Sequence, residues 1–327
     1  MRIGLFIGET SPPGSTVDEV IATAKWAEEA GLHTGWLPHV PWSLDALTGL
    51  ALIGPHTSRI ELGTAVVPTW SHHPLGMAQH ALTAQAACGG RVLLGIGPSH
   101  QMVAEGWYGA SYEGVIHHVR DYVSALEACN AAQAAANAGE GAPGGIGGVV
   151  QHGGERYPMT SFLAVPGATP VPVYLAALAP LMLRLAGERA DGTITWMGDV
   201  RTHGEYLVPR LAQAAADAGR PTPRVMAGLP IAVCDDEAVG RETAARRYGT
   251  YAQIPTYARM LARGDAESPA DVALVGPEAT IAARLREYED AGVTDLVAMV
   301  FAVGTDDATR AASRQRTRDL LAALATR

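Results

Sequence analysis

The chain has 327 residues, 48% of them hydrophobic, and a formal net charge of −9. This length and composition are those of a soluble α/β protein with a sizeable core, and one large domain accommodates them. The acidic balance provides no basic face, which excludes nucleic acid as a partner.

Cysteine usage and the first residues indicate a cytoplasmic protein. Cys88, Cys129 and Cys234 lack metal-ligand spacing, so we read them as buried thiols of a reducing cytosol. The first residues resemble a strand rather than a secretory leader. Two stretches without Asp, Glu, Lys or Arg, 62–90 and 157–183, are interrupted by Pro and Gly, so we expect no membrane span.

Short β-branched runs alternate with longer amphipathic runs rich in Ala and Leu. The predicted strands are 2–7, 34–37, 60–67, 92–96, 171–175, 192–196, 224–233 and 295–300. The predicted helices are 17–30, 44–56, 74–87, 114–129, 180–190, 202–218, one starting near 236, a helical stretch that includes Pro255, 277–291 and 307–325.

The segment 137–154 differs in composition from the rest of the chain. It is rich in Gly and other small residues and contains few residues that could belong to a hydrophobic core. We interpret it as a mobile loop, either a lid over the substrate or a surface insertion. A short strand is expected within 156–165.

Eight strand–helix units in one run predict an α/β fold, a (β/α)8 TIM barrel formed by 1–327 as a single domain, with the Gly-rich insertion after the fourth helix. Active sites of such barrels lie at the carboxyl ends of the strands, so the loops that follow the strands hold the candidate site.

Histidines follow three of the predicted strands. His39 lies between Pro38 and Pro41, where it is either a functional group or a rigidly held, hydrogen-bonded side chain. His72 and His73 are adjacent in an extended loop and diverge, with no carboxylate motif beside them, so we predict no metal site. His100 places a polar side chain in the loop after the fourth predicted strand.

Two further loops consist of small residues. Gly97, Pro98 and Ser99 follow the fourth strand and allow a ligand to approach the backbone closely. The segment 176–179 precedes Pro180 at a helix start. Either the free amides of this helix start hold a phosphate, or the small residues only allow the strand and the helix to pack closely.

The chain resembles the bacterial luciferase-like family, in particular its deazaflavin-dependent branch. The resemblance rests on WLPH at 36–39, RIELGTAV at 59–66, RVLLGIG at 91–97, PVYLAA at 172–177 and ADG at 190–192. It implies a (β/α)8 barrel, a flavin or deazaflavin at the carboxyl ends of the strands, and a homodimer. The implied cofactor is coenzyme F420, with FMN as the alternative.

The resemblance also implies roles for individual residues. His39 corresponds to a His that accepts or donates a proton beside the reacting carbon, and His100 is a second catalytic candidate. A cis peptide is implied at Ala65–Val66. The expected cofactor-binding residues are His39, Ala65, Val66, Val67, Gly97, Pro98, Ser99, Ala176, Ala177, Leu178, Ala179 and Trp196.

Two departures from the family pattern affect the expected chemistry. Pro38 stands where related dehydrogenases often carry Asp, so we expect His39 to lack that carboxylate partner. His100 replaces a Glu of the sugar-phosphate dehydrogenases, and the sequence shows no Lys/Arg cluster for a substrate phosphate, which argues against a sugar-phosphate substrate.

These observations predict an F420-dependent oxidoreductase that transfers a hydride between the deazaflavin and a small organic substrate. Reduction of a C=C or C=N bond is favoured over alcohol oxidation, with His39 as the proton relay. The alternatives are an FMN-dependent luciferase-like monooxygenase and a cofactor-binding protein without catalysis.

Overall fold

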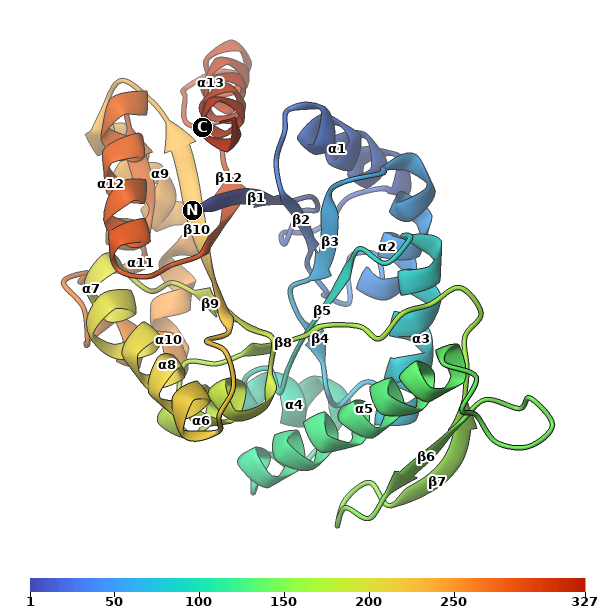
Figure 1. Ribbon diagram of the computed structural model, residues 1–327. Coiled ribbons are helices and arrows are strands. Elements are labelled where there is room, and N and C mark those ends of the chain that lie inside the picture. The colour runs from blue at the N-terminus through green and yellow to red at the C-terminus, as the bar shows by residue number, and fades with distance from the viewer. Residues whose placement is uncertain (327) are drawn as a thin grey trace. The chain divides into compact units, whose positions relative to one another are not determined.

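The computed structural model describes residues 1–326, and its strands follow the order of a (β/α)8 barrel (Figure 1). Within those residues the hydrogen-bonded order is β10-β12-β1-β2-β3-β5-β8-β9, and β9 pairs in turn with β10. This cyclic order is the predicted fold. The barrel strands are β1 (Arg2–Phe6), β2 (Thr34–Leu37), β3 (Glu61–Thr64), β5 (Val92–Gly97), β8 (Val173–Ala176), β9 (Gly192–Trp196), β10 (Arg224–Val233) and β12 (Asp295–Val300).

Burial explains why these strands could be recognised in the sequence. Every residue of β2 and β5 is buried, as are nine of the ten residues of β10. The sequence of a parallel strand that is covered on both faces is a continuous apolar run, without alternation of apolar and polar residues. The predicted 60–67 strand is interrupted: β3 and β4 (Val67–Pro68) are separated by a cis peptide between Ala65 and Val66, the bond that the resemblance implies.

Most of the principal helices agree with prediction within a few residues and begin at recognisable caps, whereas the helix predicted to end at 129 continues to Asn137. Thr16 and Glu19 form reciprocal hydrogen bonds before α1, and Gly31, with a φ of +80°, follows its end. These helices are α1 (Val17–Glu29), α2 (Ala46–Ile53), α3 (Pro74–Ala87), α5 (Val115–Asn137), α6 (Pro180–Arg189), α8 (Val208–Asp217), α9 (Glu237–Tyr248), α12 (Glu278–Asp290) and α13 (Asp307–Ala325).

Several shorter elements divide or extend the predicted ones. The predicted 202–218 helix consists of α7 (Val200–Thr202), a π-helical turn η2 (His203–Leu207) and α8. The end of the predicted 44–56 helix is η1 (Gly54–His56), and the helical stretch predicted at Pro255 is α10 (Pro255–Leu261). The elements that were not predicted are α4 (Gln101–Tyr108), η3 (Gly249–Gln253), α11 (Pro269–Val272) and β11 (Leu274–Gly276). Each is too short to develop a readable hydrophobic period.

The chain divides into two compact units. The first contains residues 1–6, 26–36 and 177–327, and the second contains residues 7–25 and 37–176.

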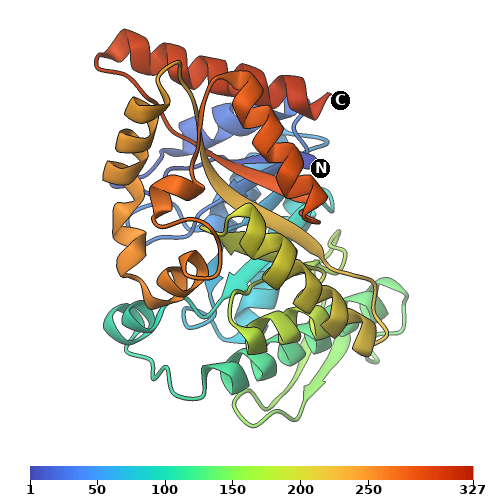
Figure 2. The same cartoon turned by 90° about the vertical axis from the view of Figure 1, so that its left-hand side faces the viewer.

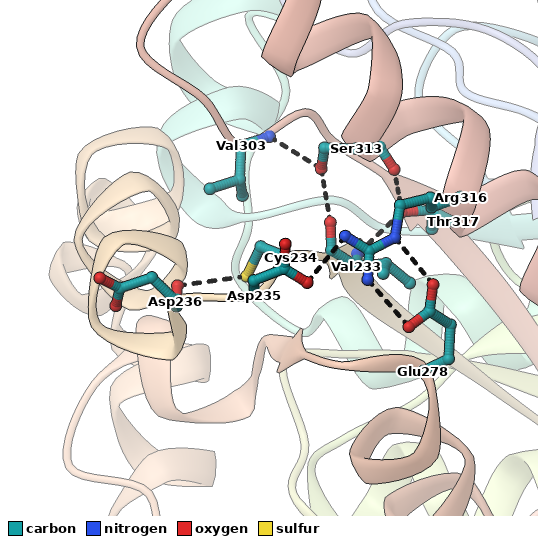
Figure 3. A network of polar contacts seen from close by, with 9 residues as sticks. All are labelled: Val233, Cys234, Asp235, Asp236, Glu278, Val303, Ser313, Arg316 and Thr317. Carbon is teal, nitrogen blue, oxygen red and sulfur yellow. Dashed lines mark hydrogen bonds and ion pairs between the residues drawn. The ribbon is translucent and has the colours of Figure 1, made fainter.

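The first unit is closed by α13, which is hydrogen-bonded to the end of β10 (Figure 3). Ser313 Oγ donates to the Val233 carbonyl at 2.7 Å and accepts from the Val303 amide, while Thr317 Oγ1 accepts from the Val233 amide at 2.8 Å. The Arg316 guanidinium also contacts Glu278 and Asp235. The helix thus satisfies buried backbone groups at the end of the strand.

The segment expected to be a mobile loop is more ordered than predicted. Helix α5 continues to Asn137, and β6 (Gly148–His152) pairs antiparallel with β7 (Met159–Leu163) to form a hairpin beside α5 (Figure 1). The interpretation of 148–152 as loop is therefore wrong. The strand has only five residues, and the exposed Val149 beside the buried Val150 removes the alternation of apolar and polar residues that would have indicated it.

Asp121 on α5 attaches the hairpin to the second unit. Its Oδ1 lies 2.7 Å from His152 Nε2, and its Oδ2 accepts from the amides of Arg156 and Tyr157 at 2.6 and 3.1 Å. These bonds hold the Asp121 pKa below its ordinary value although burial acts in the opposite direction. One carboxylate thus fixes both ends of the connection between β6 and β7.

The three cysteines are free and buried, as predicted. Within residues 1–326, no group of three or more His, Cys, Asp or Glu side chains is arranged to hold a metal ion. No helix in that part of the chain is long and apolar enough to cross a membrane.

We predict that Asp121→Ala loosens the hairpin without unfolding the chain. Loss of three acceptor contacts leaves two amides unsatisfied, which corresponds to roughly 1–3 kcal/mol. Hydrogen exchange of the 148–163 amides is expected to accelerate by about tenfold or more. The matched Glu113→Ala variant should leave that exchange unchanged, and equal exchange in both variants would contradict the role of Asp121.

Candidate functional site

His39 follows β2 and is held by the start of α2. Its side chain is only 13% exposed, and Nδ1 accepts a hydrogen bond from the Ala46 amide at 3.3 Å. Since Nδ1 is the acceptor, the neutral ring carries its proton on Nε2. The imidazole is therefore oriented by the backbone and presents a donor at its other nitrogen.

Asp45 is a carboxylate partner that the sequence reading missed. Its Oδ1 accepts from the Thr48 amide at 2.8 Å as the N-cap of α2, and its Oδ2 lies 3.5 Å from His39 Nδ1. The expectation that Pro38 deprives His39 of a carboxylate is thus wrong, because the following helix start supplies one. An Asp immediately before an apolar run is an N-cap signal, which could have identified it.

The protonation states of this pair are set by burial and by neighbouring charges. Burial lowers the pKa of His39 below its ordinary value, Asp45 opposes that shift, and His72 adds to it. Burial opposes ionisation of Asp45, but its bonds to Thr48 and the nearby His39 hold its pKa low. At neutral pH the pair consists of a neutral imidazole and a carboxylate.

Three of the predicted cofactor-binding residues come together in the second unit. A Cβ placed on Gly97 would lie 2.9 Å from the Ala176 Cβ and 3.3 Å from Val66 Cγ2. These strand ends approach so closely that only glycine fits at 97. Val67 continues the same backbone segment in β4 and is buried.

The turn at Pro98 and Ser99 is fixed from two sides. Trp70 Nε1 donates to the Pro98 carbonyl at 2.8 Å, and Tyr112 Oη donates to the Ser99 carbonyl at 3.1 Å. Ser99 itself has a φ of +55°, which is uncommon for a residue with a side chain. The carbonyls are engaged, so the turn is a rigid feature of the second unit.

Trp70 is supported by a buried histidine. Its ring stacks on His118 with centroids 3.7 Å apart, and His118 is hydrogen-bonded to Thr69 and Tyr157 at 2.8 and 3.0 Å. Burial lowers the pKa of His118 to about 4, so the ring is neutral. Tyr157 belongs to the hairpin connection, which thereby contacts the support of the Pro98 turn.

His100 is the residue before α4 and is half-buried. Burial lowers its pKa, so at neutral pH this ring is uncharged as well. His100 lies at the start of α4, whereas His39 is held by the start of α2.

The remaining predicted residues belong to the first unit. Ala177, Leu178 and Ala179 precede Pro180, and Ala179 is the N-cap of α6 without a side-chain hydrogen bond. Tyr206 Oη donates to the Leu178 carbonyl at 3.2 Å, which fixes this segment. The first amides of the helix thus have no side-chain cap.

Trp196 ends β9 within an aromatic cluster. Its ring packs edge-on against Phe6 and Tyr251, with centroid distances of 5.8 Å in both cases. These contacts explain its position by packing within the first unit.

Comparison with known proteins identifies the family. The family model described as luciferase-like monooxygenase matches residues 1–295. A putative coenzyme F420-dependent oxidoreductase of Mycobacterium tuberculosis is 30% identical over 73% of this chain and 68% of its own length. An F420-dependent glucose-6-phosphate dehydrogenase of Nocardia farcinica is also 30% identical, over 62% of this chain and 60% of its own length.

The fold is shared with solved structures across the whole chain. A monooxygenase from Streptomyces bottropensis superposes with a TM-score of 0.74 at 18% sequence identity, covering 99% of this chain and 98% of its own. The match of the family model over residues 1–295 shows that the chain belongs to the luciferase-like monooxygenase family.

Proposed function

We propose that this protein is a coenzyme F420-dependent oxidoreductase that transfers a hydride between the deazaflavin and a small organic substrate. The sequence relatives include oxidoreductases whose names specify F420. The observation that carries the proposal is the orientation of His39, whose Nδ1 is held by Ala46 beside Asp45. This arrangement suits a group that exchanges protons through Nε2.

The residues present are compatible with a planar cofactor that has an anionic tail. In the second unit, the backbone at 65–67 and the fixed turn at 97–99 would hold the ring system. In the first unit, the start of α6 offers amides without a side-chain cap, which suit a phosphate. When bound, the deazaflavin supplies or accepts the hydride, which is chemistry that no side chain offers.

His39 would handle the proton that accompanies the hydride. Protonation of Nδ1 replaces its hydrogen bond from the Ala46 amide with an attraction to Asp45 Oδ2, 3.5 Å away, and the ring then has a proton to give from Nε2. After that transfer the remaining proton is on Nδ1, where the carboxylate stabilises it. Asp45 would therefore stabilise both protonated forms that the relay requires.

Reduction of a C=C or C=N bond is the direction we favour. The lowered pKa of His39 makes its imidazolium a readier proton donor than an ordinary histidine. The half-buried His100 would be a second polar group for substrate orientation.

We predict that the purified protein binds F420 and not reduced FMN. Titration of tryptophan fluorescence with each cofactor separately measures the preference, and an oxygen electrode measures turnover with reduced FMN. Saturable binding of F420 without oxygen consumption is expected. Preference for reduced FMN with oxygen uptake would instead identify a flavin monooxygenase.

His39→Gln is expected to lower kcat by about 10²–10⁴-fold, because it removes the proton relay. F420 affinity should change little, since the flanking backbone remains. The assay follows hydride transfer from reduced F420 to a panel of enones and imines. His56→Gln, which alters an exposed histidine, is the matched control. Full turnover by the His39 variant with tight cofactor binding would refute the assigned role.

Asp45→Asn is expected to move the His39 limb of the kcat–pH profile to lower pH. Asp45 raises the His39 pKa, so removal of its charge lowers that pKa further. In the reductive direction the protonated ring is required, and the rate then falls at a lower pH than in the wild type. Asn retains the helix cap, so the unfolding midpoint should be nearly unchanged. A limb that stays in place would exclude Asp45 from the relay.

A further inference from the structure

Two tryptophans of the second unit, Trp42 and Trp107, are in contact with each other at the surface. Their rings lie edge to face, with centroids 5.6 Å apart and an interplanar angle of 71°. The two residues are 40% and 50% exposed. A single exposed apolar residue needs no explanation, whereas two exposed indoles in contact form a continuous apolar surface that suits a ligand.

Trp42 is held on the loop that carries His39. The Ser43 amide donates to the Val40 carbonyl at 3.0 Å, which closes a turn around Trp42. The indole Nε1 donates to the Thr10 carbonyl at 3.1 Å, so the side chain is fixed against the loop that follows β1. Because Trp42 comes three residues after His39, their Cα atoms are at most about 11 Å apart.

Trp107 lies on α4, the helix that begins after His100. These two residues are seven positions apart, which is two helical turns, so they share one face of the helix with Ala104. Ala104 is the one buried residue of α4, so this face is turned toward the protein. Figure 2 shows α4, the short teal helix at the lower left, joined to the longer α5 by an extended segment. Trp107 therefore stands at the open edge of the contact that Ala104 makes.

The paired indoles connect the two segments that carry the candidate histidines, His39 and His100, and these segments offer little charge. Burial lowers the pKa of both histidines, so neither ring is charged at neutral pH. The carboxylates of Asp45 and Glu105 are already hydrogen-bonded within their own helices. No Lys or Arg stands in the three loop segments that meet at the indoles, which are 7–16, 36–44 and 97–112. A neutral molecule is therefore the electrostatic match for this surface.

The size and geometry of the surface fit an aromatic small molecule. An aromatic side chain buries about 150–250 Å², so the exposed parts of the two indoles amount to roughly 200 Å². A stable protein–protein interface takes about 800 Å² from each partner, which is far more. Two indoles at a steep angle allow a planar aromatic ring to stack on one of them and to meet the other with its edge. A saturated ring gains neither contact.

We propose that Trp42 and Trp107 form a substrate-recognition site, and that the substrate is a neutral molecule with an aromatic group next to the reacting bond. This inference rests on the proposed function, because it assigns the aromatic surface to the substrate of that reaction. The indoles bind the aromatic group equally in the ground state and in the transition state. They therefore contribute to KM and not to kcat.

The test compares benzylideneacetone with its cyclohexyl counterpart, which has the same enone and a saturated ring in place of the phenyl ring. Both are assayed with reduced F420 in the wild type, Trp107→Leu and Trp107→Phe. Trp107→Leu should raise KM for benzylideneacetone by about three- to tenfold with kcat unchanged, and should change KM for the cyclohexyl counterpart much less. Trp107→Phe keeps an aromatic ring and should restore most of the wild-type KM.

Leu52→Ala is the control, because it alters an exposed apolar residue at the end of α2 remote from His39. A Trp107→Leu variant that keeps the wild-type ratio of the two KM values overturns the proposal. If that variant instead changes the oligomeric state in analytical ultracentrifugation with the ratio unchanged, the surface is an interface between copies of the chain. If F420 supports no turnover at all, the proposed function fails. Trp107-dependent binding of benzylideneacetone in a calorimetric titration would then still support the recognition site, and its absence would overturn it.

Discussion

The hydrogen bond from the Ala46 amide to His39 Nδ1 is the interaction on which the candidate chemistry depends. A helix start offers amides that have no partner within the helix, and here one of them fixes the tautomer of an imidazole. The carboxylate that caps the same helix is also the nearest negative charge to the ring. One helix terminus therefore orients the His39 ring, sets which ring nitrogen is free and shifts the pKa of the imidazole.

The barrel order was readable from the sequence because its strands are buried on both faces. β2, β9, β10 and β12 have the predicted bounds, since long apolar runs between helices identify them without tertiary information. The β6–β7 hairpin was not readable, because its order depends on Asp121, a contact across more than thirty residues. Sequence periodicity does not report such a contact.

The residues of the candidate site, like the elements of the fold, could be predicted from the sequence only in part. Position after a strand identified His39 and the Gly97 turn, and the resemblance implied the cis bond that is present at Ala65–Val66. Asp45 was not predicted as the partner of His39, because the turn that joins β2 to α2 brings the two side chains together. The roles assigned to the site residues, from His39 to Trp196, all stay predictions.

Burial of the three cysteines has a practical consequence for labelling. Burial raises the pKa of Cys88 to about 11 and that of Cys129 to about 12, and it raises the pKa of Cys234 as well. Thiolates are the species that react with maleimides and peroxides, so all three native thiols are protected. A cysteine introduced at the exposed position 140, just beyond α5, would therefore accept a fluorophore selectively, and the hairpin could be followed optically in the otherwise native chain.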